Sequence, residues 1–117
     1  MNTGFITDNL GKKRVIKYAV VDAATSGDNT VVSAVTGYKI RVLSVWLISA
    51  GTVNTRWESG ASGTALTGQA TLAVNTGYVL GYNPGGWFET TAGALLNLEL
   101  SGAISVDGSL SYIEVEA

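Results

Sequence analysis

A chain of 117 residues has the length of one domain, and it is long enough to bury a core without help from a metal or a disulfide. Charged residues make up 14% of it, well below the usual share of about a quarter, and the formal net charge is −2. Cysteine and histidine are absent, which excludes disulfides, thiolate nucleophiles and histidine-dependent catalytic triads. We therefore expect a binding or structural module with no catalytic residues, no cofactor and no metal.

The first eleven residues lack strand periodicity and carry two isolated apolar side chains, Phe5 and Ile6. They form either a frayed terminus or an arm that docks on a neighbouring subunit. We accordingly divide the chain into an N-terminal arm, residues 1–11, and a β-sandwich domain, residues 12–117. Neither a secretory signal nor an apolar run long enough to span a bilayer is recognisable, so we expect no membrane association.

Four of the seven basic side chains fall in one short stretch directly after this arm, at Lys12, Lys13, Arg14 and Lys17. Such a run is typical of a solvated strand edge, and it could also contact an acidic partner. The remaining basic residues are too few for the broad positive stripe that neutralises phosphates. We therefore expect no nucleic-acid binding.

Turn-forming Gly, Asn, Asp and Ser recur at short intervals along the rest of the chain and separate runs rich in Val, Ile, Leu, Thr and aromatic residues. This pattern predicts an all-β, antiparallel sandwich or barrel of about eight strands. The expected strands are residues 13–21, 30–35, 38–49, 53–58, 71–74, 87–90, 95–100 and 109–116. Asp107-Gly108 reads as a hairpin turn before the last strand.

Strict alternation in two of these strands predicts one buried and one wet face. The residues expected to point inward are Leu96, Leu98 and Leu100 in one strand, and Val53, Thr55 and Trp57 in the other. Strand 38–49 differs, because the apolar phase slips after Val42. This slip indicates either a β-bulge near Val42 or a strand covered on both faces, and the second case would suggest a subunit interface. The last strand has apolar residues on both faces as well.

Acidic side chains are candidates for catalytic or metal-binding groups. A pair of carboxylates can hydrolyse glycosides, but Glu58 and Glu89 each follow an aromatic residue in an alternating strand, which predicts a solvated outer position. The spacing of Asp22, Asp28 and Asn29 matches no calcium loop, and these residues are expected to form turns.

Aromatic residues gather around the loop Asn83-Pro84-Gly85-Gly86, where side chains commonly meet partners. We take Tyr78, Tyr82 and Trp87 as candidate partner contacts, together with Phe5 and Ile6 in the arm. The same aromatic rings could stack on sugars. Trp57 instead continues an inward set and is expected to fill the core.

Several segments resemble small structural proteins of tailed bacteriophages. One runs over residues 83–90, Asn-Pro-Gly-Gly-Trp-Phe-Glu-Thr, and the most telling piece is its Gly-Trp-Phe-Glu-Thr, residues 86–90, followed by the alternating Leu-Asn-Leu-Glu-Leu-Ser of residues 96–101. Residues 35–44, 64–68 and 112–115 extend the resemblance. Proteins of this kind are capsid decoration or cement proteins and related virion components.

The resemblance implies a jelly-roll-like β-sandwich that assembles as a homotrimer on the capsid surface of the virion and clamps the major capsid protein. Such a protein is made in the host cytoplasm, stabilises joints between capsid subunits and is no enzyme. Two alternatives stay open at this point. One is a carbohydrate-binding β-sandwich of a tail or fibre, and the other is a different virion connector component.

Overall fold

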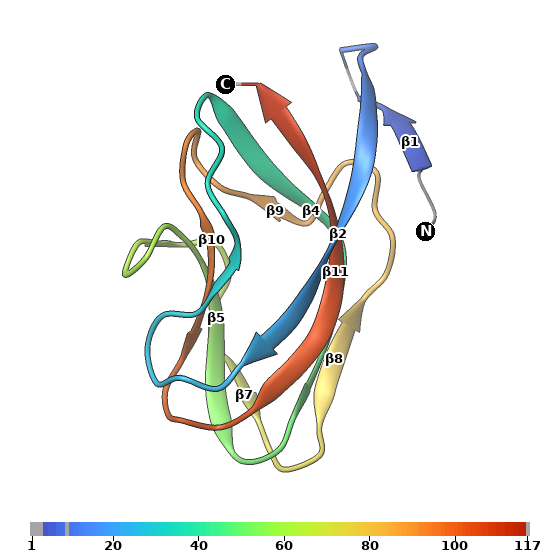
Figure 1. Ribbon diagram of the computed structural model, residues 1–117. Helices are drawn as coiled ribbons and strands as arrows, with labels where there is room; N and C mark the ends of the chain where they lie inside the picture. The colour runs from blue at the N-terminus through green and yellow to red at the C-terminus, as the bar shows by residue number, and fades with distance from the viewer. Residues whose placement is uncertain (1–3, 9, 117) are drawn as a thin grey trace.

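The computed structural model describes residues 4–8 and 10–116, which form an all-β sandwich of two antiparallel sheets (Figure 1). The strands are β1 (Gly4–Thr7), β2 (Lys13–Ala23), β3 (Thr30–Val32), β4 (Tyr38–Ser49), β5 (Val53–Ser59), β6 (Thr64–Ala65), β7 (Ala70–Leu72), β8 (Gly77–Leu80), β9 (Phe88–Glu89), β10 (Leu96–Leu100) and β11 (Val106–Glu116). This confirms the predicted fold class. The described residues include no helix that is long and apolar enough to cross a membrane.

The larger sheet has the strand order β1-β2-β11-β4-β8, with β9 also pairing with β4. The smaller sheet has the order β3-β10-β5-β6, with β7 also pairing with β5. The long strands β2, β4 and β11 give the molecule its elongated shape, and the smaller sheet covers one face of the larger (Figure 1). Among residues 4–8 and 10–116, no second layer covers most of the opposite, outer face of the larger sheet.

The main core lies between the sheets and follows the alternation of the strands. The predicted inward sets of β5 and β10 are confirmed, because Leu96, Leu98, Leu100, Val53, Thr55 and Trp57 are all buried. Trp57 is the largest of them, at 1% exposure, and its ring stacks on Phe88 with 5.8 Å between centroids. Burial of these apolar side chains is the main favourable contribution to folding.

The phase slip in β4 is a β-bulge. Ser44 pairs with Ser111 of β11 and Val42 pairs with Tyr112, so Leu43 is the extra residue. The strand keeps Ile40 and Val42 in the main core before the bulge, and Val45 and Leu47 after it. A bulge thus restores the inward phase of a strand whose sequence has slipped by one residue.

The extra residue Leu43 belongs to a second buried cluster with Ile113 and Val115, against which Ile6 and Ile16 pack. The second predicted possibility, cover on both faces, therefore also holds at this point. The cover comes from β1 and β2 of the same chain, so burial at Leu43 gives no evidence for a subunit interface.

Part of the N-terminal segment forms a strand that the sequence did not predict. Gly4–Thr7 forms β1, an edge strand in register with β2 from Lys13 to Ile16. The four residues are too few to show periodicity, and their strand structure comes from pairing with β2. Residues 1–3 and 9 of the predicted arm lie outside the described residues.

Two further expectations need correction. Asp107-Gly108 lies inside β11 and forms no turn. A Cβ at Gly108 would lie 1.8 Å from the Trp46 carbonyl oxygen, so glycine is there because the backbone of β4 comes so close. In addition, β8 was not predicted, because the run between the turn residues Gly77 and Gly81 is only three residues long.

Candidate functional site

The outer face of the larger sheet carries a groove built by strand register. Ser109 of β11 lies between Val20 of β2 and Trp46 of β4, and Trp46 pairs in turn with Val79 of β8. In the next row Ser111 lies between Tyr18 and Ser44. The central strand thus presents small serines, flanked on both sides by large side chains at Ser109 and by Tyr18 on one side at Ser111.

We call this depression, about 400 Å³ in volume, the outer-face groove. Its lining residues are Ile16, Tyr18, Ser44, Val45, Trp46, Val79, Leu80, Gly81, Tyr82, Ser109, Leu110 and Ser111. Apart from the two tyrosines, none of these has an ionisable side chain. The hydroxyls of Ser44 and Ser111 on the floor form a hydrogen bond with each other. The groove is therefore a mainly apolar, uncharged surface in which the Ser44 and Ser111 hydroxyls are paired with each other.

The three aromatic residues predicted to form one contact site are separated. Tyr78 points into the sandwich, where its hydroxyl accepts a hydrogen bond from Trp57 Nε1 at 3.0 Å, and burial raises the pKa of Tyr78. Tyr82 is exposed and lines the outer-face groove. Trp87 is 47% exposed beside the loop, and its Nε1 donates to the Gly81 carbonyl at 2.8 Å.

The two candidates in the N-terminal segment are separated in the same way. Phe5 is exposed on β1, and the Lys13 ammonium lies over its ring, 4.3 Å from the centroid. Ile6 packs against the cluster of Leu43, Ile113 and Val115. Phe5 is thus available to a partner, whereas Ile6 already has apolar contacts within its own chain.

Most of the groove escaped the sequence analysis. Tyr18, Val20, Trp46 and Val79 were not singled out, although all are large, apolar and exposed. One sequence signal could have identified Trp46 as exposed. The phase slip in β4 places its side chain on the outer face of the strand, whereas the neighbouring Val45 and Leu47 point inward. Nothing in the sequence shows that β2, β11, β4 and β8 are neighbours, so the residues could not be gathered into one surface.

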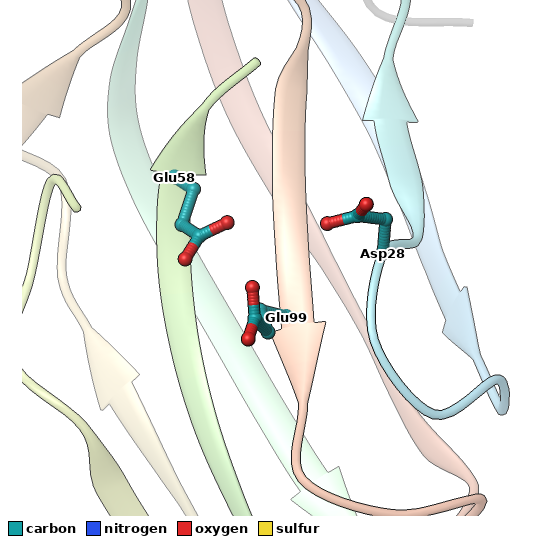
Figure 2. Close-up of side chains that lie close together, drawn as sticks. All are labelled: Asp28, Glu58 and Glu99. Carbon is teal, nitrogen blue, oxygen red and sulfur yellow. The ribbon is translucent and has the colours of Figure 1, made fainter. Parts of the chain in front are cut away.

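A carboxylate cluster lies on the outer face of the smaller sheet, where Asp28, Glu58 and Glu99 come within 4.8 Å of one another (Figure 2). Glu58 is 1% exposed, which contradicts the predicted solvated position. The reason is Asn97, which is buried between the acids and donates to Asp28 Oδ1 (2.7 Å) and Glu58 Oε1 (3.0 Å). The loop that carries Asp28 folds over this part of the sheet.

The oxygens of the carboxylate cluster have partners of their own. Asp28 accepts bonds from the Ser62 backbone and hydroxyl, which lower its pKa, and Arg56 donates to Glu58 at 2.7 Å. The Glu99 pKa is raised, first by its hydrogen bond with Glu58. These three are the side chains that could hold a cation, but their present bonds link β10, β5 and two loops, which is a structural role.

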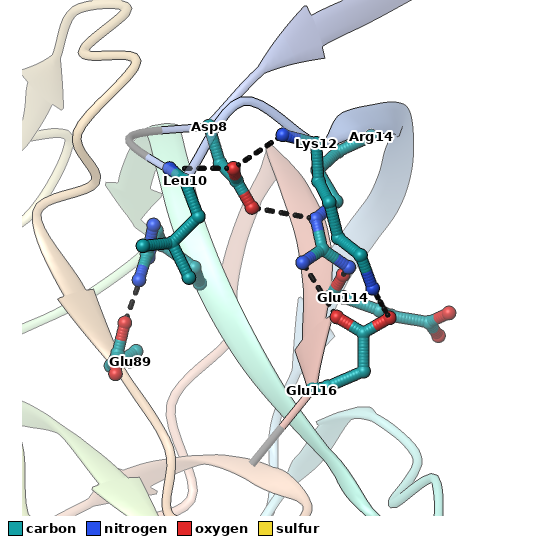
Figure 3. A network of polar contacts seen from close by, with 8 residues as sticks. Asp8, Leu10, Lys12, Arg14, Glu89, Glu114 and Glu116 are labelled. Carbon is teal, nitrogen blue, oxygen red and sulfur yellow. Dashed lines mark hydrogen bonds and ion pairs between the residues drawn. The ribbon is translucent and has the colours of Figure 1, made fainter.

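The basic stretch takes part in a polar network with the end of β11 (Figure 3). Asp8 accepts hydrogen bonds from the Leu10 and Lys12 backbones and from Arg14, and Glu116 pairs with both Arg14 and Lys12. Lys17 pairs with Glu114. In these contacts the basic side chains therefore bind acidic groups of their own chain.

The chain matches no protein-family model. A search of curated proteins likewise gives no match. The function of the chain must therefore be inferred from the geometry of its surfaces and from its resemblance to small structural proteins of tailed bacteriophages.

Proposed function

We propose that the protein is a non-enzymatic virion structural protein that binds the outside of a phage capsid as a decoration or cement homotrimer and stabilises the joints between capsid subunits. The observation that carries the proposal is the outer-face groove, a sizeable binding surface whose lining offers apolar contact and no reactive group beyond hydroxyls. The resemblance of residues 83–90 and 96–101 to phage decoration proteins supports the same conclusion.

The order of strand pairing supports a jelly-roll arrangement. β2 pairs with β11, β3 with β10, β4 with β8 and β5 with β7, so that successive strands from the start pair with successive strands from the end. A long antiparallel ribbon rolled up on itself produces this nested pattern, and jelly rolls of eight strands are common in viral capsid proteins.

The mechanism we propose is additional contact area. A bound trimer touches more than one capsid subunit, and each contact raises the free energy needed to separate them. A specific interface of standard size covers about 1,200–2,000 Å² in total. Trp87 and Phe5 supply exposed aromatic surface for such a contact outside the groove.

The experiment that tests the proposal is binding of the purified protein to intact capsids that lack it. We expect saturable binding and a higher temperature of capsid disruption when the protein is bound. Capsids that neither bind the protein nor gain stability from it would contradict the proposal.

We expect Trp87→Ala to weaken capsid binding by more than about tenfold, because exposed tryptophans often dominate interface energy. The thermal midpoint of the free protein should change little, since Trp87 is half exposed. Val74→Ala, at another exposed apolar residue outside the groove, is the control. An equal loss of stability and binding in Trp87→Ala would show that the ring serves folding only.

A second candidate function is carbohydrate binding, which is favoured by three exposed aromatic residues, Tyr18, Trp46 and Tyr82, along one groove. Sugars stack on such rings, but they also need polar groups that are free to bond. Here Ser44 and Ser111 bond to each other. Titration with a glycan panel, followed by tryptophan fluorescence, decides between the two functions, because a sugar in the groove would change the Trp46 signal.

A further inference from the structure

The outer-face groove extends into a continuous apolar surface. The exposed side chains Tyr18, Val20, Trp46, Ile48, Val79 and Tyr82 lie on β2, β4, β8 and the residues after β8, all around the serines of β11. The first charged residues along β2 and β11 are Asp22 and Asp107. They are cross-strand neighbours, one row beyond Val20 and Ser109. The surface thus has an apolar centre and a polar margin, as protein interfaces do.

We propose that this surface is the contact between copies of the chain. The inference deepens the proposed function, because it assigns a surface to the homotrimer and leaves Trp87 and Phe5 for the capsid. It rests on the proposed function only for the number of copies.

Removing water from this surface desolvates no charge, because no charged side chain lines the groove. The Ser44 and Ser111 hydroxyls keep their mutual hydrogen bond, whereas those of Ser109, Tyr18 and Tyr82 need partners on the other copy. An unpaired buried polar group would cost free energy, whereas a paired one costs little. A mainly apolar partner therefore suits the groove better than a polar ligand does.

The area agrees with what a stable interface needs. Aromatic side chains present about 150–250 Å² each, so three that are about half exposed and three exposed aliphatic ones together present roughly 500 Å². A standard interface covers about 800 Å² on each partner, of which about 60% is apolar. The surface is thus close to the apolar share of one complete interface, and in a ring of three copies it is divided between two contacts.

The shape favours a second copy as the partner. Twisted sheets pack face to face when their twists agree, and two copies have the same twist. The surface also combines large exposed side chains, Trp46 and Val79, with the small Ser109 and Ser111 beside them. In a closed ring of three copies the contacts join different patches, so the Trp46 side of one copy packs over the serines of the next.

The test is the solution mass of wild type and two matched variants, measured by light scattering at two concentrations. Val20→Lys places a charge on the surface, and Val74→Lys places the same charge at an exposed residue outside it. These valines are 75% and 56% exposed, so neither change disturbs the fold of a single chain. Circular dichroism spectra verify the fold of each variant.

We expect wild type and Val74→Lys to be trimers of the 12.1 kDa chain, and Val20→Lys to be a monomer. Placing a lysine ammonium in this apolar contact should lower the association constant by at least about 100-fold. A Val20→Lys variant with the wild-type mass would overturn the assignment of this surface without affecting capsid binding. A monomeric wild type would also overturn it, and a wild-type dimer with monomeric Val20→Lys would support the surface and refute the trimer.

Discussion

At the scale of single residues, the side chains that matter most are polar ones whose partners come from distant segments. Arg14 is buried although it lies in a basic stretch, because it bonds to Asp8 on one side and to Glu116 on the other. Asn97 is completely buried on a strand position that alternation assigns to solvent, because two carboxylates accept hydrogen bonds from its side-chain amide. Composition alone would place all of these side chains on a wet surface.

The network around Arg14 makes a prediction about acid stability. The hydrogen bond from Arg14 lowers the pKa of Glu116 from 4.5 to about 2, and the Lys12 backbone lowers that of Asp8. A carboxyl group whose pKa is lowered in the folded state binds its proton more tightly in the unfolded chain than in the folded one. Its stabilising contribution is therefore present above pH 4.5 and is lost as the pH falls from 4.5 to about 2.

We expect Glu116→Gln to flatten part of the pH dependence of the thermal midpoint in this range. The profile should stay sloped, because Asp8 and Asp28 also have lowered pKa values. The measurement is the midpoint of thermal unfolding at a series of pH values for both proteins. Parallel profiles for wild type and variant would show that the Arg14–Glu116 pair does not stabilise the folded chain in solution.

At the scale of elements, the pairing of β4 with β11 holds the larger sheet together. The pairing runs along almost the whole of both strands and is interrupted only at the bulge. Gly108 allows the two backbones to approach, since a Cβ there would overlap the Trp46 carbonyl. The outer-face groove depends on the same pairing, because Trp46 and Ser109 are neighbours across it.

We expect Gly108→Ala to lower the free energy of unfolding by at least about 3 kcal/mol, because the backbone must move to admit the methyl group. Gly102→Ala is the matched control, since a Cβ at Gly102 meets no atom within 4 Å. Urea unfolding followed by circular dichroism measures both. Similar losses for the two variants would mean that the contact at Trp46 is relieved at little cost.

The N-terminal hairpin is the second element whose role changes with the structure. Deleting residues 1–11 would remove Ile6 from the cluster of Leu43 and Ile113 and Asp8 from Arg14. A weaker capsid attachment of such a deletion would therefore reflect damage to the fold as well as loss of contact. Substitution of Phe5, which is exposed, separates the two effects.

At the scale of the whole molecule, the two sheets share one main core. Val21, Val45 and Leu110 of the larger sheet belong to the same buried cluster as Trp57 and Leu98 of the smaller one. Neither sheet can lose its partner without exposing this cluster. The domain should therefore unfold as one cooperative unit.

We expect the urea transition to have the same midpoint by circular dichroism, which reports the strands, and by tryptophan fluorescence, to which buried Trp57 contributes. Both probes should be recorded at one protein concentration, because association raises apparent stability. Two separated midpoints would show that one sheet, or the hairpin with its smaller cluster, unfolds independently.

The sequence by itself determined most strands of the sandwich, though not β1, β6 or β8, and the inward residues of β5 and β10, because alternation with a period of two is a local property. It also indicated the bulge in β4. Tertiary structure alone decided which outer faces stay open: it brought Tyr18, Trp46, Val79 and Tyr82 together and buried Glu58 against Asn97. The physical reason is that periodicity tells which residues share a face, whereas long-range pairing decides what covers that face.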